Sequence, residues 1–270
     1  MILSSTKKGF LLMLKVCPLG SGSKGNCVYL QSDKAKILID AGLSFAEIKR
    51  RLSDIDVRLY ELDGVIITHE HNDHITGLSG FRGSGIPIFV HTFAAPIIGG
   101  KFQGLELKKI SEQAFDFADL SITPFKIPHD AVYPLGYRIS SKNKTLSVAT
   151  DVGFAADNII EAMKDSDCIV VEANHDESLL INGGYPKRLK ERILGGRGHL
   201  SNASSAELLS KIITRRTSNL LLAHLSEENN LPELAFETVA KKLAENGFYE
   251  RGDFKIGVLK QNERGSFFDV

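Results

Sequence analysis

Short apolar runs, bounded by turn-forming residues, follow one another through the first half of the chain and predict β-strands. Two similar runs occur later, between segments of helical character. The expected strands are residues 14–17, 27–30, 36–39, 65–67, 86–89, 122–127, 136–139, 146–149, 168–171 and 220–223.

Apolar residues at helical spacing predict helices between and after these runs. The pattern is strongest at Leu189 and Ile193, and again around Leu208 and Ile212. Strands and helices in this order favour an α/β fold in which helices cover the outer faces of sheets, but periodicity does not distinguish one sheet from two. The expected helices follow Ser44, Ala155, Pro186 and Ser204, and a further one runs from Pro232 to about Glu245.

The composition is that of a globular protein that can bury a full core. Of 270 residues, 43% are hydrophobic, and 33 basic residues balance 33 acidic ones. This excludes a disordered or collagenous chain and a polycation that coats nucleic acid, although local potential still allows a nucleic-acid enzyme. Without a linker-like tract, we expect one domain over residues 13–270, preceded by an extension, residues 1–12, with Met13 as an alternative start.

Cysteine usage and the apolar runs indicate the compartment. The three cysteines, Cys17, Cys27 and Cys168, are too few and too scattered for a disulfide framework or a cysteine-based zinc site. The apolar run at residues 10–14 is too short for a signal core or a membrane span. We therefore expect a cytoplasmic protein without a membrane partner.

The strongest chemical signal is the segment His69-Glu70-His71-Asn72-Asp73-His74, which holds three of the eight histidines. It directly follows an apolar strand run. His69 and His71, two apart in extended chain, share a side, and a helix starting near Asn72 would turn Asp73 and His74 towards a second position. Imidazole and carboxylate ligands suit zinc, manganese or iron, and paired ions hydrolyse phosphate esters.

Four further side chains follow the ends of strand-like runs or lie in a short loop, and each is a candidate ligand. Taken singly, such a histidine is more often a hydrogen-bonded core residue than a ligand, and such an aspartate is more often a turn residue. A dinuclear site needs about this many additional ligands, which favours the joint interpretation. From position alone, two of them, His199 and His224, compete equally for the last ligand position. The four are His129, Asp151, His199 and His224.

The pattern His69-x-His71-x-Asp73-His74 resembles the signature of the metallo-β-lactamase-fold hydrolases. Residues 37–42, 149–153 and 223–226 are similar to further motifs of that fold. Within it, the chain most resembles the YycJ/WalJ-type bacterial exonucleases, through residues 20–27, 68–71, 172–176, 198–202 and 224–230. The resemblance covers roughly residues 14–245 and implies an αββα sandwich, two mixed sheets with helices on their outer faces and metals at one edge.

The resemblance also implies roles for individual residues. His69, His71 and His129 would bind one divalent ion; Asp73, His74 and His224 would bind a second, with Asp151 bridging the two. Asp40 would orient the histidine segment, as a buried aspartate does in that family. A hydroxide between the ions would attack phosphorus, Asp73 would orient it, and His199 would protonate the leaving oxygen. Zinc and manganese suit these ligands equally.

Candidate substrate contacts are less specific. The glycine pattern at residues 20–25 precedes a strand rather than a helix, so it predicts a turn and not a nucleotide-cofactor site. Ser21, Ser23 and Asn26 in this turn would line the substrate entrance or serve only the turn. His175 is a candidate contact, an extra ligand or a structural residue.

A basic run with Lys187 and Arg188, followed by Arg197, is either a solvated helix face or a track for phosphates. The chain lacks tryptophan, and no segment resembles an aromatic platform of the kind that single-strand binders use.

These observations favour a metal-dependent phosphodiesterase, by resemblance a 5′–3′ DNA exonuclease with a nucleic-acid substrate. The alternative is a small-molecule hydrolase of the same fold that acts on thioesters, lactones or cyclic phosphodiesters. A positioned acid such as His199 favours the first, since alkoxide leaving groups need a proton and thiolates do not. A catalytically silent metal-binding module is a third hypothesis, which the intact ligand set disfavours.

Overall fold

The computed structural model describes residues 14–270, and the expected extension over residues 1–12 lies outside them. Two seven-stranded sheets face each other, with strand orders β14-β1-β2-β3-β4-β5-β6 and β13-β12-β11-β10-β9-β8-β7. The strands are β1 (Lys15–Gly20), β2 (Cys27–Gln31), β3 (Lys36–Ile39), β4 (Gly64–Ile66), β5 (Pro87–His91), β6 (Glu106–Ile110), β7 (Phe115–Phe117), β8 (Leu120–Lys126), β9 (Leu135–Ser141), β10 (Lys144–Ala149), β11 (Cys168–Glu172), β12 (Asn219–Ala223), β13 (Lys255–Val258) and β14 (Phe268–Asp269).

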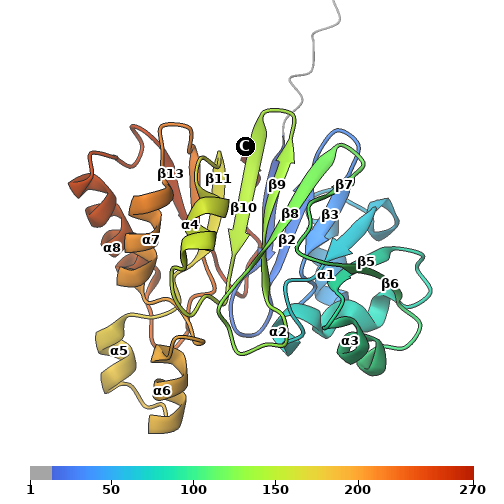
Figure 1. Cartoon of the computed structure of the whole chain (residues 1–270), viewed down its shortest axis with the longest axis horizontal. Helices are drawn as coiled ribbons and strands as arrows, with labels where there is room; N and C mark the ends of the chain where they lie inside the picture. Colours follow the sequence, from blue (N-terminus) through green and yellow to red (C-terminus); the bar gives the residue numbers. More distant parts are fainter. Residues whose placement is uncertain (1–13) are drawn as a thin grey trace, which may run out of the picture.

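Helices cover the outer face of each sheet, α1 that of the first sheet and α4, α7 and α8 that of the second (Figure 1). The helices are α1 (Phe45–Ser53), α2 (Asn72–Ile75), α3 (Ala95–Lys101), α4 (Asp157–Met163), α5 (Glu177–Asn182), α6 (Lys187–Leu194), α7 (Asn202–Ile212) and α8 (Pro232–Glu245), with 3₁₀ turns η1 (Leu59–Glu61) and η2 (Thr76–Phe81).

The strands are apolar on both faces because each sheet is packed on both sides. In β4, Ile66 belongs to the core between the sheets, whereas Val65 packs under α1 and η2. In β11, Val170 points between the sheets and Ile169 packs under α4, α7 and α8. Three apolar layers thus separate four layers of elements, and the expected αββα sandwich is confirmed.

The last two strands of the chain are edge strands, one in each sheet. β14 pairs with β1, and β13 pairs with β12, so both strands beyond residue 250 extend the same two sheets. This pairing agrees with the prediction that residues 13–270 form one domain, which stays a prediction. Within residues 14–270, we find no helix that combines the length and the apolar character needed to span a membrane.

Local sequence explains the helix boundaries. The Ser44 side chain accepts a hydrogen bond from the backbone N–H of Glu47 and thereby caps α1. Ser201 caps α7 in the same way through Ser204, so this helix begins at Asn202, slightly earlier than the periodicity predicts. Pro232 occupies the first turn of α8, where its missing N–H costs nothing.

Candidate metal centre

The candidate ligands gather where several strands end. β3 and β4 are parallel, as are β10, β11 and β12, so their carboxyl ends lie together at one edge of each sheet. Three residues that follow these ends adopt left-handed backbone conformations, at φ values of 62° for Asp40, 60° for Asp151 and 56° for His224. Side chains other than glycine rarely adopt this conformation, and it concentrates at functional sites.

Three histidines form the first cluster of possible ligands, His69, His71 and His129. The His69 Nε2 atom lies 3.1 Å from His71 Nδ1, and His129 Nε2 lies 3.3 Å from the same atom. Burial, with neighbouring histidines, lowers the pKa of both His69 and His129. The rings are therefore neutral, which is the form that binds a metal ion.

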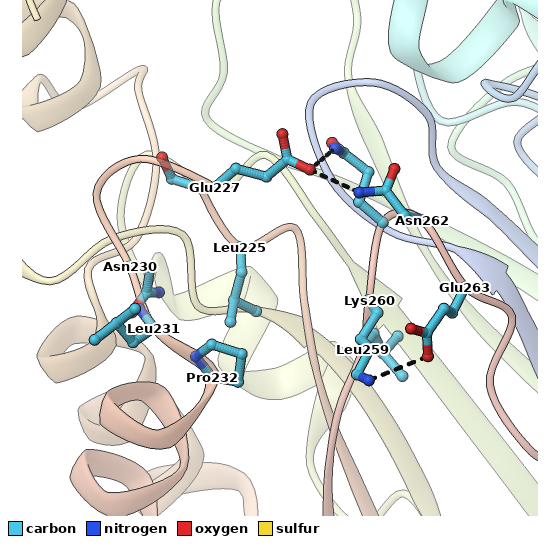
Figure 2. A pocket seen from close by; sticks show the side chains of 11 residues that line it. Leu225, Glu227, Asn230, Leu231, Pro232, Leu259, Lys260, Asn262 and Glu263 are labelled. Carbon is cyan, nitrogen blue, oxygen red and sulfur yellow. Dashed lines mark hydrogen bonds and ion pairs between the residues drawn. The ribbon is translucent and has the colours of Figure 1, made fainter.

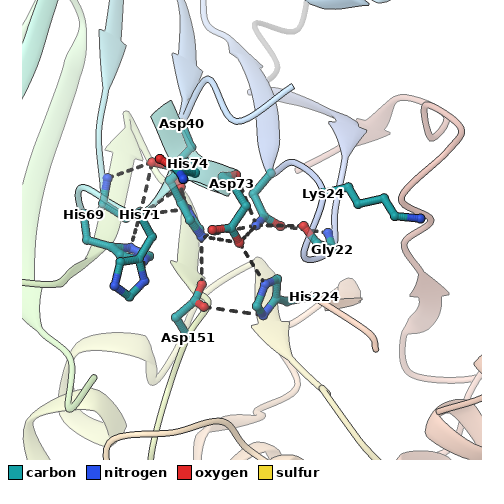
Figure 3. Close-up of polar contacts among 12 residues, drawn as sticks. Gly22, Lys24, Asp40, His69, His71, Asp73, His74, Asp151 and His224 are labelled. Carbon is teal, nitrogen blue, oxygen red and sulfur yellow. Dashed lines mark hydrogen bonds and ion pairs between the residues drawn. The ribbon is translucent and has the colours of Figure 1, made fainter. Parts of the chain in front are cut away.

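The second cluster contains Asp73, His74, Asp151 and His224 (Figure 3). Asp73 Oδ2 lies 3.4 Å from both His74 Nε2 and His224 Nε2. Asp151 Oδ2 lies 3.0 Å from His74 Nε2, and its other oxygen lies 3.7 Å from His129 Nε2 of the first cluster. Asp151 thus lies between the two clusters, where the bridging ligand is expected.

One buried atom in this cluster tests whether a cation fits. Asp151 Oδ2 is buried and accepts no hydrogen bond of acceptable geometry from any residue of 14–270. A buried carboxylate oxygen without a hydrogen-bond donor is costly unless a cation compensates it. Together with the neutral imidazoles of the first cluster, the donor set fits divalent metal ions, and the cluster indicates divalent metal binding.

Asp40 supports the histidine segment from behind. Its Oδ2 lies 2.7 Å from His74 Nδ1, and its Oδ1 accepts the backbone N–H of Thr68 at 2.8 Å. If the His74 Nδ1–H donates to Asp40, Nε2 is left free to face the second cluster. The structure therefore places Asp40 where an orienting carboxylate is expected.

Glu172 is a site residue that the sequence pattern does not single out as functional. It ends β11, is fully buried, and its Oε1 lies 2.8 Å from His199 Nδ1 and 2.7 Å from His224 Nδ1. Its Oε2 accepts the backbone N–H of Val152 and of Leu200, at 2.8 and 3.0 Å. An acidic residue at the end of an otherwise apolar strand run is the one signal by which the sequence marks it.

The contacts of Glu172 also help to distinguish His199 from His224, which their positions in the sequence leave as equal candidates for the last ligand position. His224 directs Nε2 towards Asp73 in the second cluster. His199 belongs instead to a third group of possible ligands, with Asp151, Glu172 and His224, in which its Nδ1 lies against Glu172. Burial opposes protonation of His199, but the carboxylates of Glu172 and Asp151 outweigh it and raise the pKa of His199. The ring is therefore suited to carry a proton beside the clusters.

The residues of the glycine-containing turn are tied to the centre. Asn26 Nδ2 lies 3.3 Å from Asp73 Oδ2, and Ser21 Oγ accepts the backbone N–H of His224 at 2.8 Å. Both are buried, whereas Ser23 is exposed. The turn joins the antiparallel strands β1 and β2 in a hairpin, so the expected turn is confirmed.

The remaining candidate contacts are distributed over one flank. His175 is buried, and its Nε2 has no hydrogen-bond partner among residues 14–270, but it belongs to none of the ligand clusters. Lys187 and Arg188 are exposed on α6, which Figure 1 shows at the end of the molecule where α2 lies. Arg197 donates from Nε to the His129 backbone oxygen at 3.1 Å.

A pair of charges fastens α6 to the centre. Arg192 Nε and Nη2 lie 2.6 and 3.0 Å from the carboxylate oxygens of Asp130. The Asp130 carboxylate in turn lies 3.2 Å from His129 Nε2. The basic helix is therefore held next to the first ligand cluster.

A hollow of about 400 Å³ lies between the loop that follows His224 and the segment that follows β13 (Figure 2). Leu225, Leu231 and Leu259 supply much of its apolar lining. Glu227 accepts hydrogen bonds from Gln261 at 2.6 Å and from Asn262 at 3.0 Å, which ties the loop after β12 to the segment after β13.

Comparison with known proteins agrees with this fold. A family model described as "Beta-lactamase superfamily domain" matches residues 35–225. The chain belongs to the metallo-β-lactamase branch of this superfamily.

Two bacterial relatives have similar length. The exodeoxyribonuclease WalJ of Streptococcus pneumoniae is 38% identical and the exodeoxyribonuclease YycJ of Bacillus anthracis 34% identical; each alignment covers 88% of this chain, and 91% and 92% of the relative. The expected YycJ/WalJ type is confirmed. The metallo-β-lactamase fold protein YhfI from Bacillus subtilis superposes with a TM-score of 0.73 at 19% identity, covering 96% of this chain and 100% of YhfI.

Proposed function

We propose that this protein is a metal-dependent exodeoxyribonuclease that digests DNA in the 5′–3′ direction. The observation that carries the proposal is the sharing of Asp151 between two ligand clusters, with His199 beside them. The names of the relatives, both exodeoxyribonucleases at 34–38% identity, support DNA as the substrate. The 5′–3′ polarity rests on the resemblance described above.

Seven side chains would hold two divalent ions, zinc or manganese. Bound there, the ions would supply an activated water and stabilise negative charge on the phosphate. His69, His71 and His129 form one ligand set. Asp73, His74 and His224 form the other, and Asp151 serves both.

Three further tasks fall to the chain itself. His199, with Nδ1 held by Glu172, presents its other ring nitrogen for donating a proton to the leaving oxygen. Asp73 combines metal binding with the orientation of the attacking water. Asp40 fixes the direction of His74.

The exposed cations of α6 provide a path for the DNA backbone. Lys187 and Arg188 are exposed and can meet phosphates, since Lys187 has only a long ion pair of 3.8 Å with Glu191. The pairing of Arg192 with Asp130 keeps their helix beside the metal clusters. Arg197, on the loop that leads to His199, extends this path. Ser23 lies at the exposed tip of the turn between β1 and β2, whereas Ser21, Asn26 and His175 are buried and would support substrate binding indirectly.

A cytoplasmic location stays a prediction. All three cysteines are free and buried, which agrees with a reducing compartment.

The test is digestion of 5′- and 3′-labelled DNA and RNA by purified protein, with Mn²⁺ or Zn²⁺ added. We expect metal-dependent loss of DNA from the 5′ end, abolished in Asp73→Ala and His199→Ala. Thioester, lactone and cyclic phosphodiester substrates are assayed in parallel. If the protein hydrolyses one of these and leaves every nucleic acid intact, the alternative small-molecule hydrolase is correct.

A further inference from the structure

Three aromatic rings from two distant segments of the chain pack against one another. The rings of His91 and Tyr133 are stacked, with centroids 3.7 Å apart and an angle of 7° between their planes. Phe93 packs against both, at 5.3 Å from His91 and 5.6 Å from Tyr133. The sequence shows no aromatic platform because these residues come from distant parts of the chain, but the fold assembles one.

Backbone and side-chain contacts connect this cluster to the candidate ligands. Val132, next to Tyr133, donates its backbone N–H to Glu70 at 2.8 Å, and Glu70 lies between His69 and His71. His91 ends β5, which is parallel to β4, so Phe93 leaves the sheet at the edge from which His69 also leaves. Figure 1 shows α2 and α3, the helices that follow these two strands, at the same end of the molecule.

The ring that remains free is that of Phe93. His91 covers one approach to Tyr133, and the Lys126 ammonium lies 4.7 Å from the Tyr133 ring centroid. Phe93 itself is 61% exposed. It borders an open hollow of about 490 Å³ whose walls also include Thr92, Ser111, Glu112 and Gln113. The Glu112 carboxylate accepts a hydrogen bond from the Tyr133 hydroxyl.

An exposed aromatic ring beside a cation and a phosphodiesterase centre suits one class of ligand. Bases of single-stranded nucleic acid stack on aromatic side chains, and nearby cations pair with the phosphates between them. The stacked His91–Tyr133 pair gives Phe93 a rigid support, and Lys126 is exposed. A rigid ring loses little conformational entropy on binding.

We propose that Phe93 forms a stacking subsite for one nucleobase of the DNA strand, next to the phosphate bound at the metal centre. Lys126 would pair with the adjoining phosphate. This inference rests on the proposed nuclease function. It identifies a determinant of substrate binding that is separate from the metal ligands and from the basic helix.

The experiment measures DNA binding and cleavage separately. Metal-loaded protein is mixed in a stopped-flow instrument with single-stranded oligonucleotides that carry 2-aminopurine at one of the first four positions, so that binding is recorded before cleavage. Phe93→Ala is compared with Phe93→Trp, which restores a stacking surface. Tyr60→Ala is the matched control. Tyr60 is an exposed aromatic residue (83% exposed), and it lies before the start of β4, whereas the histidine segment follows the end of that strand.

We expect Phe93→Ala to weaken binding by about five- to a hundredfold and to abolish the fluorescence change at one position. Phe93→Trp should restore both, and Tyr60→Ala should change neither. Placing an abasic nucleotide at that position should remove the difference between wild type and Phe93→Ala.

Each contrary result has a distinct meaning. If Phe93→Ala binds like wild type, or if its defect persists with abasic DNA at every position, the stacking subsite is wrong although the nuclease stands. If wild type binds DNA without cleaving it, the nuclease proposal is wrong and the fluorescence still decides the subsite. If wild type does not bind DNA, both are wrong.

Discussion

The Glu172 carboxylate lies 2.8 Å from Nδ1 of His199, deep beneath the metal centre. The same oxygen lies 2.7 Å from Nδ1 of His224, so one buried side chain orients both the candidate acid and a candidate ligand. Such supporting carboxylates fix the ring orientation and the tautomer of the histidines they contact. A change at Glu172 would therefore affect both proton donation by His199 and metal binding by His224.

Replacing Glu172 by glutamine should therefore impair catalysis more than folding. The amide keeps the shape but places an N–H₂ group where only acceptors are needed, opposite the donors of the two rings or of Val152 and Leu200. We expect kcat on DNA to fall by about tenfold to a hundredfold. The folded state is verified by circular dichroism, and a Glu172→Gln enzyme with wild-type kcat would contradict this role.

Asp40→Asn should weaken metal binding. Asp40 Oδ2 lies 2.7 Å from His74 Nδ1, and Oδ1 accepts the Thr68 backbone N–H at 2.8 Å. The amide removes the negative charge and places an N–H₂ group against one of these two nitrogens, which weakens the support that directs His74 Nε2 to the second cluster. Changes of this kind lower metal affinity about tenfold to a hundredfold. Isothermal titration of metal-stripped protein with Zn²⁺ measures the effect. Asp119→Asn, which changes an aspartate bonded to Ser32 far from the centre, should leave the affinity unchanged.

Removing the exposed cations of α6 should change the salt dependence of DNA binding. In Lys187→Ala/Arg188→Ala, we expect the slope of log Kd against log salt to become shallower by about 1 for each residue that contacts a phosphate. Fluorescence anisotropy at several salt concentrations gives the slope. Replacing Lys255, an exposed lysine at the start of β13, is the control. An unchanged slope in the double variant would remove the helix from the DNA path.

Gly42→Ala should strongly destabilise the fold. A Cβ atom at this position would lie 1.6 Å from the backbone oxygen of Asp73 and 2.6 Å from the backbone nitrogen of Asn26, neither of which is a flexible side-chain end. Overpacking of this severity costs roughly 3 kcal/mol or more. Urea denaturation measures the loss.

Gly100→Ala in α3 is the matched control for that substitution. Its Cβ would have no neighbour within 4 Å among residues 14–270, and alanine favours the helix by about 1 kcal/mol. We expect an unchanged or slightly higher midpoint. Equal stability of the Gly42 and Gly100 variants would refute the close approach at Gly42.

The three thiols should be unreactive in the native protein. Burial raises the pKa of Cys17 to about 11 and that of Cys168 to about 12, and it also raises the pKa of Cys27. A raised pKa leaves the thiol protonated at pH 8, and only the thiolate is nucleophilic. Ellman's reagent at pH 8 should label none of them until the protein is unfolded, and rapid labelling of the folded protein would contradict this.

The fold was predictable where strands are buried on both faces. The run at residues 36–39 matches β3, and α8 spans the expected residues, because strong apolar patterns and a proline mark them. The edge strand β6 was missed because its residues are mostly exposed and polar, so it carries little apolar signal. Helix α3 contains Gly99 and Gly100, which disfavour helix, and packing rather than propensity forms it.

The sequence predicts those candidate site residues that lie close together in the chain or directly follow a strand. His69, His71, Asp73 and His74 lie within six residues, and the structure brings His129, Asp151 and His224 to them. Glu172 was missed as a site residue because a single carboxylate forms no recognisable motif with its neighbours in the sequence. The meeting of Phe93 with Tyr133 was missed because it arises only from tertiary structure.

The most direct test of the metal-dependent nuclease is the rate of DNA digestion as a function of metal bound per chain. Protein stripped with EDTA is reconstituted with increasing Mn²⁺ or Zn²⁺, bound metal is measured by atomic emission, and release of nucleotides from 5′-labelled DNA is followed. We predict no digestion by stripped protein and a rate that rises with metal up to two ions per chain. Full digestion by the stripped protein, or none by the loaded protein, would contradict the central claim.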